Sequence, residues 1–228
     1  SMREITVRSL SGLLYVAIIV SAALYSNLAL IVVLFLFTVL ALFEFQRLLH
    51  YKSPIPFLFF GLLVYQFYTE ILINTLHFGL LVISFFMNFL LAFMLIKKKS
   101  FVFSPFQKSG LTLFYLISSG YFIIASTSFE SSWMNGITLS MYFLIWTNNS
   151  FAYVFGKKWG KNSLFPEVSP KKTWEGSVGG GIATLLVAGA FAYAFGDVFT
   201  TEMWIGAGLI AVFFGSWGDL VESLLKRS

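Results

Sequence analysis

A short polar run, residues 169–176, holds the densest reactive chemistry in the chain. Lys171 and Lys172 supply adjacent positive charges, and Thr173 and Glu175 add a hydroxyl and a carboxylate. Either Ser169 or Thr173 could cap a following helix, whose free N–H groups and partial positive charge would attract a phosphate. A basic loop can also serve only to fix membrane topology. Topology needs positive charge alone, however, so the mixed run favours binding of a phosphate-bearing substrate.

A second polar stretch, residues 146–153, interrupts an apolar segment with Asn148 and Asn149 and ends at Tyr153. Polar residues within a membrane helix usually face the bundle interior or a water-filled cavity. Hydrogen bonding between helices explains the two asparagines equally well. The sequence leaves both interpretations open.

Two carboxylates, Asp219 and Glu222, lie three residues apart near the end of the chain, so one helical face presents both. Carboxylates on a membrane helix are costly unless they have a task. Mg²⁺ suits such oxygen ligands, because it typically takes one or two carboxylates together with substrate phosphates. We therefore predict Mg²⁺ binding by Asp219 and Glu222, although Glu222 could instead pair with Lys226 at the helix end.

The composition shows what kind of protein must position these groups. The chain is 58% hydrophobic and only 11% charged, whereas a soluble domain has roughly a quarter of its residues charged. It is therefore an integral membrane protein, and its continuous apolar runs favour helices over a barrel with alternating polarity. The lack of Cys excludes disulfides, thiolate catalysis and Cys-ligated zinc. We read the net charge of +5 as membrane topology and expect no nucleic-acid partner.

The predicted fold is an all-α, polytopic bundle of about eight transmembrane helices, since a span needs about 20 mostly apolar residues. We treat residues 1–228 as a single transmembrane domain, with N-terminal helices in 1–135 and the reactive motifs in 136–228. The predicted helices lie at about 10–25, 28–46, 55–73, 78–96, 110–127, 136–155, 175–196 and 203–224.

The distribution of charge supports an even number of spans. All fifteen Lys and Arg residues fall in segments on one side, whereas the loops on the other side carry Glu70, Glu130, Asp197 and Glu202. The positive-inside rule then places both chain ends in the cytoplasm. We expect a multi-pass protein of the cell inner membrane or plasma membrane, with its active site facing the cytoplasm.

The three motifs together resemble the phosphatidate cytidylyltransferase family, also called CDP-diglyceride synthetase. The resemblance rests on residues 169–176, the Gly-containing run 152–161 before them, and residues 218–227 after them. It implies that CTP and phosphatidic acid give CDP-diacylglycerol and pyrophosphate in phospholipid biosynthesis, with Mg²⁺ required. It also implies a helical homodimer in the lipid bilayer with a polar cavity open to the cytoplasm.

The resemblance also implies roles for individual residues. Asp219 would be catalytic and would bind metal, whereas Glu222 is the second metal candidate from its spacing alone. Lys171 and Lys172 would be the catalytic contacts to phosphates. The remaining residues assigned to substrate or nucleotide binding are Ser169, Thr173, Glu175, Asn149, Tyr153, Lys226 and Arg227.

The chain departs from the family pattern at two places. The family signature continues past the Lys226–Arg227 pair into a segment with further acidic ligands, and this sequence ends at Ser228. Asn149 stands where the family pattern leads us to expect Asp, and an amide binds a divalent cation less well than a carboxylate. We therefore expect residues 1–228 to be weakly active or inactive.

Two other functions are considered. A CTP-dependent polyprenol or phytol kinase would share the nucleotide chemistry, but the run at residues 169–176 argues against it. A membrane transporter would place polar residues toward both faces and often shows an internal repeat. Here the polar groups gather in the predicted cytoplasmic half, and the sequence has no visible repeat.

Overall fold

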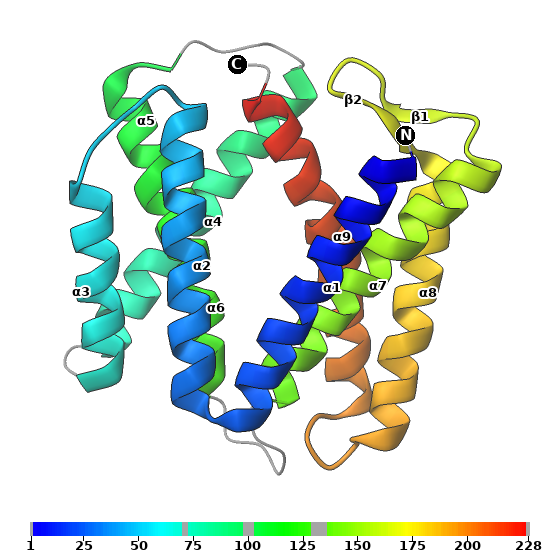
Figure 1. The fold of residues 1–228 in the computed structure, drawn as a ribbon, viewed down its shortest axis with the longest axis horizontal. Coiled ribbons are helices and arrows are strands. Elements are labelled where there is room, and N and C mark those ends of the chain that lie inside the picture. The colour runs from blue at the N-terminus through cyan, green and yellow to red at the C-terminus, as the bar shows by residue number, and fades with distance from the viewer. Residues whose placement is uncertain (1, 70–72, 98–102, 129–135, 227–228) are drawn as a thin grey trace. The chain divides into compact units, whose positions relative to one another are not determined.

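The computed structural model describes residues 2–69, 73–97, 103–128 and 136–226. The first helices are α1 (Met2–Tyr25), α2 (Asn27–Leu48), α3 (Ile55–Thr69) and α4 (Ile73–Lys97), as Figure 1 shows. A continuous helical stretch follows, made of α5 (Pro105–Leu111), the π-helical η1 (Thr112–Ile117), α6 (Ser118–Ala125) and the 3₁₀ turn η2 (Ser126–Ser128). The remaining elements are α7 (Gly136–Trp159), β1 (Ser163–Phe165), β2 (Ser169–Thr173), α8 (Trp174–Ala194) and α9 (Thr201–Leu225).

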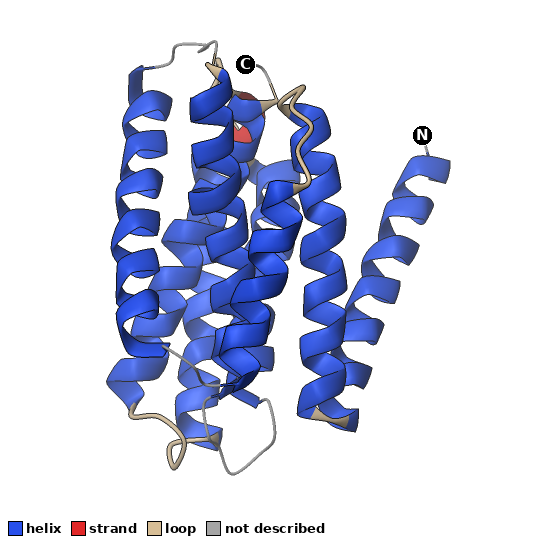
Figure 2. Cartoon of the chain, turned by 90° about the vertical axis from the view of Figure 1, so that its left-hand side faces the viewer, coloured by secondary structure: helices blue, strands red, loops and turns tan. Residues whose placement is uncertain are grey.

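Helices dominate the described residues (Figure 2). If the stretch from α5 to η2 is taken as one segment, each of the eight predicted ranges contains a helix. The sequence did not predict the short β1–β2 hairpin, which occupies the polar connection between α7 and α8. This hairpin forms where Pro166 and Pro170 oppose a continuous helix.

Five described helical segments are long and apolar enough to cross a membrane. They are Asn27–Leu48, Thr75–Lys97, Pro105–Ser128, Trp174–Ala194 and Thr201–Leu225. Shorter apolar stretches occupy Leu10–Tyr25 and Ile55–Thr69. The chain is thus an all-α membrane protein, as predicted, while the total of eight spans and the cytoplasmic position of both ends stay predictions.

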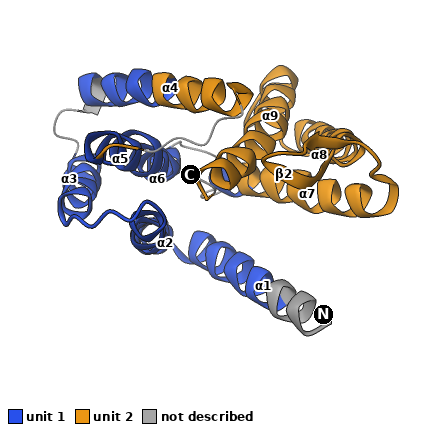
Figure 3. Cartoon of the chain, turned by 90° about the horizontal axis from the view of Figure 1, so that it is seen from above, with its two compact units in different colours: residues 1–85, 105–139 blue, residues 86–104, 140–228 orange. Residues whose placement is uncertain are grey.

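The chain divides into two compact units, coloured separately in Figure 3. Unit 1 comprises residues 1–85 and 105–139, and unit 2 comprises residues 86–104 and 140–228. Within unit 1, α2 packs against α1, α3 and the η1–α6 stretch, and buries Leu30, Leu34 and Leu42. The sequence-based division at residue 135 and the single-domain interpretation stay predictions.

In unit 2, α7, α8 and α9 pack around Leu144, Ala188 and Ala211, one from each helix. A Cβ atom at Gly180 would lie 2.6 Å from the carbonyl oxygen of Asn148 and 2.9 Å from Cβ of Ala152. The α8 backbone therefore approaches α7 more closely than any larger residue would permit. This close packing at Gly180 holds α7 and α8 together.

Candidate active site

The hairpin places Lys171 and Lys172, which lie in β2, next to the beginning of α8. Strands β1 and β2 pair antiparallel, with Ser163 opposite Thr173 and Phe165 opposite Ser169. Thr173 then caps α8, because its side-chain oxygen accepts the backbone N–H of Gly176 at 3.1 Å. The cap is Thr173 and not Ser169, a choice that the sequence left open.

Glu175 holds the base of the hairpin closed by binding the residues just before β1. Its carboxylate accepts the backbone N–H groups of Lys161 at 3.1 Å and Asn162 at 3.3 Å. The side-chain amide of Asn162 donates to the same carboxylate at 2.8 Å. Glu175 therefore supports the loop that carries the lysines, and it lies outside the lining of the cavity described next.

A cavity of about 210 Å³ opens between the hairpin and the ends of α7, α8 and α9, entirely within unit 2. It brings together six residues that the sequence assigned to the site and three that it did not. The six are Asn149, Tyr153, Lys171, Lys172, Thr173 and Asp219; the three are Ala152, Ser177 and Ser216.

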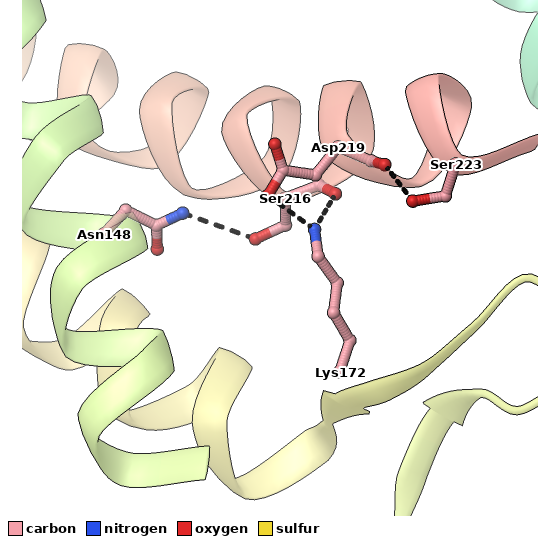
Figure 4. A network of polar contacts seen from close by, with 5 residues as sticks. All are labelled: Asn148, Lys172, Ser216, Asp219 and Ser223. Carbon is pink, nitrogen blue, oxygen red and sulfur yellow. Dashed lines mark hydrogen bonds and ion pairs between the residues drawn. The ribbon is translucent and has the colours of Figure 1, made fainter. Parts of the chain in front are cut away.

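Lys172 and Asp219 form an ion pair across this cavity (Figure 4). The ammonium nitrogen lies 3.0 Å from Asp219 Oδ2 and donates to the backbone oxygen of Ser216, also at 3.0 Å. The side chains are 25% and 49% exposed, respectively. Water reaches both partners, so the pair stabilises the fold by no more than about 1 kcal/mol and can be broken readily.

The two asparagines of α7 have different surroundings. Asn148 is fully buried, and its side-chain amide donates to the hydroxyl oxygen of Ser216 on α9 at 3.3 Å (Figure 4). Asn149 lines the cavity. Consecutive helical residues point about 100° apart, so neighbouring side chains can have different surroundings. Asn148 therefore makes a hydrogen bond between helices, and Asn149 faces the cavity; the sequence had left both interpretations open.

The other predicted residues lie away from the cavity lining. Glu222 forms an ion pair with Lys226 one turn along α9, and both side chains are more than half exposed. Ser169 sits at the start of β2 opposite Phe165. Arg227 lies outside the described residues, and its role stays a prediction.

Two serines that the sequence interpretation missed line the cavity. Ser216 lies three residues before Asp219 and therefore on the same face of α9, a spacing that could have identified it. Ser177 lies in the first turn of α8, beside the cap formed by Thr173. Its place next to the lysine pair in sequence was the available signal.

The oxygen donors present limit how a metal could bind. Among the described residues there is no group of three or more His, Cys, Asp or Glu side chains that could hold a metal ion. Asp219 is the carboxylate of the cavity lining, and Asn149 adds an amide. This set fits Mg²⁺ that arrives with phosphate ligands, since Mg²⁺ commonly binds through one or two carboxylates plus substrate phosphates.

The fold and the site define a helical membrane protein with a cavity, lined by two lysines and an aspartate among other residues, at one end of the helices α7, α8 and α9. The chain belongs to the cytidylyltransferase family, whose family model matches residues 6–228. The family resemblance inferred from the three motifs is thereby confirmed.

Individual relatives are named phosphatidate cytidylyltransferase. The protein of Staphylococcus aureus strain COL is 37% identical over 146 residues, which cover 62% of this chain and 53% of the relative. The protein of Bacillus subtilis strain 168 is 34% identical over 143 residues, covering 60% and 51% respectively. The chain thus spans about half the length of the curated relatives that it matches. No solved structure matches the chain.

Proposed function

We propose that this protein is a phosphatidate cytidylyltransferase, which joins CTP and phosphatidic acid to give CDP-diacylglycerol and pyrophosphate in phospholipid biosynthesis. The observation that carries the proposal is the convergence of Lys171, Lys172 and Asp219 on one cavity. Family membership and the names of the relatives support the same reaction. The cavity lies at the end of α9 and beside the hairpin, where a water-soluble nucleotide and a lipid headgroup could meet.

In this reaction an oxygen of the lipid phosphate attacks the α-phosphorus of CTP, and pyrophosphate leaves in line. The protein need not supply a covalent nucleophile; it must hold two anions together and offset their charge. Lys171 and Lys172 supply ammonium donors for phosphate oxygens. Asp219 would hold Mg²⁺, which neutralises phosphate charge when bound.

The uncharged groups of the cavity suit the remaining polar parts of the substrates. Asn149, Ser177 and Ser216 offer an amide and two hydroxyls, and Tyr153 adds an aromatic ring with a phenol. We propose that they bind the nucleotide or the headgroup. Lys226 would reach a phosphate only after leaving Glu222. The proposed metal role of Glu222 rests on its spacing to Asp219, and the proposed role of Arg227 in phosphate binding rests on the family resemblance.

The location and assembly of the enzyme are part of the proposal. The one-sided distribution of Lys and Arg supports a multi-pass protein of the inner or plasma membrane with the cavity facing the cytoplasm. A homodimer is proposed from the family resemblance.

A radiochemical assay tests the reaction. Purified protein in detergent is incubated with labelled CTP, phosphatidic acid and Mg²⁺, and we expect label in a chloroform-soluble lipid, at a low rate because of Asn149. Asp219→Asn should abolish that label. Phosphorylation of a lipid alcohol, or solute flux without turnover, would support the kinase or the transporter instead. CTP binding is measured in parallel, and a protein that neither binds CTP nor labels lipid contradicts the proposal.

A further inference from the structure

Lys172 occupies the oxygen atoms that a cation at this site would use. Its ammonium contacts Asp219 Oδ2 and the backbone oxygen of Ser216, each at 3.0 Å. Both oxygens belong to α9 and lie three residues apart, so they face the cavity together (Figure 4). A carboxylate oxygen beside a carbonyl oxygen is also the kind of donor set that hard divalent cations prefer.

We propose that this α9 site, made of Asp219 Oδ2 and Ser216 O, has two alternating occupants: the Lys172 ammonium and a divalent cation that enters with the nucleotide. The inference rests on the proposed function, because it assumes that a metal–nucleotide complex is the ligand. It assigns Lys172 a second role in addition to contacting phosphate, as an internal counterion that is exchanged when substrate binds.

Electrostatic repulsion makes the two occupants mutually exclusive. A divalent cation on Asp219 Oδ2 would lie within a few ångströms of the ammonium that now contacts the same oxygen. Two positive charges at that separation repel strongly even at the effective dielectric constant of a protein surface. Binding of the metal at this oxygen therefore requires Lys172 to leave it.

The surroundings of Lys172 permit this exchange without moving the backbone. The ion pair is partly exposed, so water offsets the loss of the contact. The lysine stem is flexible, and Lys172 itself lines the cavity, so a released ammonium stays within reach of a ligand there. Pairing of β2 with β1 and the Thr173 cap hold the strand in place meanwhile.

The exchange couples metal binding to nucleotide binding. A free divalent cation must expel the ammonium and leaves it without an anion. A metal–nucleotide complex expels the ammonium and supplies a phosphate that accepts it. The metal should therefore bind weakly alone and more tightly with the nucleotide, and linkage requires the reciprocal effect on nucleotide affinity.

Titration with Mn²⁺ in detergent, without nucleotide or lipid, tests the shared site. Lys172→Met removes the charge but keeps an apolar stem, and we expect its Mn²⁺ affinity to rise about 3- to 10-fold because the competing ammonium is gone. Lys172→Arg retains the charge and should bind Mn²⁺ no more tightly than the unsubstituted protein. Asp219→Asn should lose the titrated site, which identifies it.

Lys171 provides the matched control. It lines the same cavity, is exposed, and makes no ion pair with any residue that the structure describes. Lys171→Met removes one charge at a similar place, so it reports the general effect of charge on Mn²⁺ affinity, which should stay within about 2-fold at physiological salt. An equal rise in both Met variants would overturn the shared site.

The inference also fails if folded Lys172→Met, verified by thermal unfolding in detergent, binds Mn²⁺ no more tightly than the unsubstituted protein or does not bind it. The Mn²⁺ titration gives this result whether or not the protein converts CTP and phosphatidic acid to product. Tighter Mn²⁺ binding in a protein that neither binds CTP nor labels lipid would retain the shared site and reject the proposed reaction. Labelled lipid without tighter Mn²⁺ binding in Lys172→Met would support the proposed reaction and reject the shared site.

Discussion

At the scale of single residues, the position of Asn149 decides how many carboxylates can reach a ligand in the cavity. Asn149 lines the cavity together with Asp219. Asn149→Asp would add a second carboxylate, and Mg²⁺ binds best to such oxygens together with substrate phosphates. We expect the Mg²⁺ concentration that gives half-maximal rate to fall about 10-fold, equivalent to roughly 1.4 kcal/mol. The rate of lipid labelling against Mg²⁺ concentration measures this.

The neighbouring Asn148 supplies the control for that substitution. Asn148 is fully buried and bonded to Ser216, so Asn148→Asp introduces a buried charge away from the cavity lining. It should lower the unfolding temperature without improving the Mg²⁺ response. If the two variants respond to Mg²⁺ alike, the different surroundings of the two asparagines are not what determines metal affinity.

At the scale of elements, the contact of α7 with α8 depends on the lack of a side chain at Gly180. Gly180→Ala places Cβ 2.6 Å from the carbonyl oxygen of Asn148, so one helix must shift. We expect the unfolding temperature in detergent to fall by several degrees, as overpacking that costs roughly 1–3 kcal/mol would cause. Gly189→Ala on the same helix meets nothing within 4 Å and should not destabilise the protein. Equal effects of the two variants would contradict the packing argument.

The β1–β2 hairpin is the other element that positions the site, and Glu175 holds its base closed. Glu175→Ala removes the acceptor for the N–H groups of Lys161 and Asn162. We expect trypsin to cleave after Lys161 several times faster, because cleavage requires local opening of the backbone. Glu222→Ala also removes one negative charge but lies outside the hairpin. Unchanged cleavage in Glu175→Ala would show that other contacts keep the loop closed.

At the scale of the whole molecule, the one-sided distribution of Lys and Arg predicts the topology. Because the sequence contains no Cys, an introduced thiol is the single site of labelling. We expect a membrane-impermeant maleimide to label Thr201→Cys in intact cells, and Lys158→Cys only after the membrane is permeabilised. Both residues are exposed in the structure. Labelling of both in intact cells would contradict a cytoplasmic position for the lysine-rich hairpin.

Much of this architecture could be predicted from local pattern. Continuous apolar runs predicted the helices, because a helix satisfies its own backbone hydrogen bonds within lipid and only its length and polarity need to be recognised. The helix ends were predicted less accurately, since α1 begins at Met2 and not near residue 10. Helix α7 continues to Trp159, and the polar connection that follows it forms a hairpin. Pairing between strands is a contact between separate segments, which periodicity along one segment does not report.

For the site, too, the sequence predicted features within one segment but not contacts between segments. Residue type and spacing identified the lysine pair and Asp219, and they included a Glu222–Lys226 pair as an alternative because both residues lie on one helix. They could not show that Lys172 reaches Asp219 and the carbonyl oxygen of Ser216. Nor could they show that Thr173 rather than Ser169 caps α8. The different surroundings of Asn148 and Asn149 were equally out of reach. These contacts exist because three helices and a hairpin pack together, and packing depends on side-chain volumes far apart in the chain.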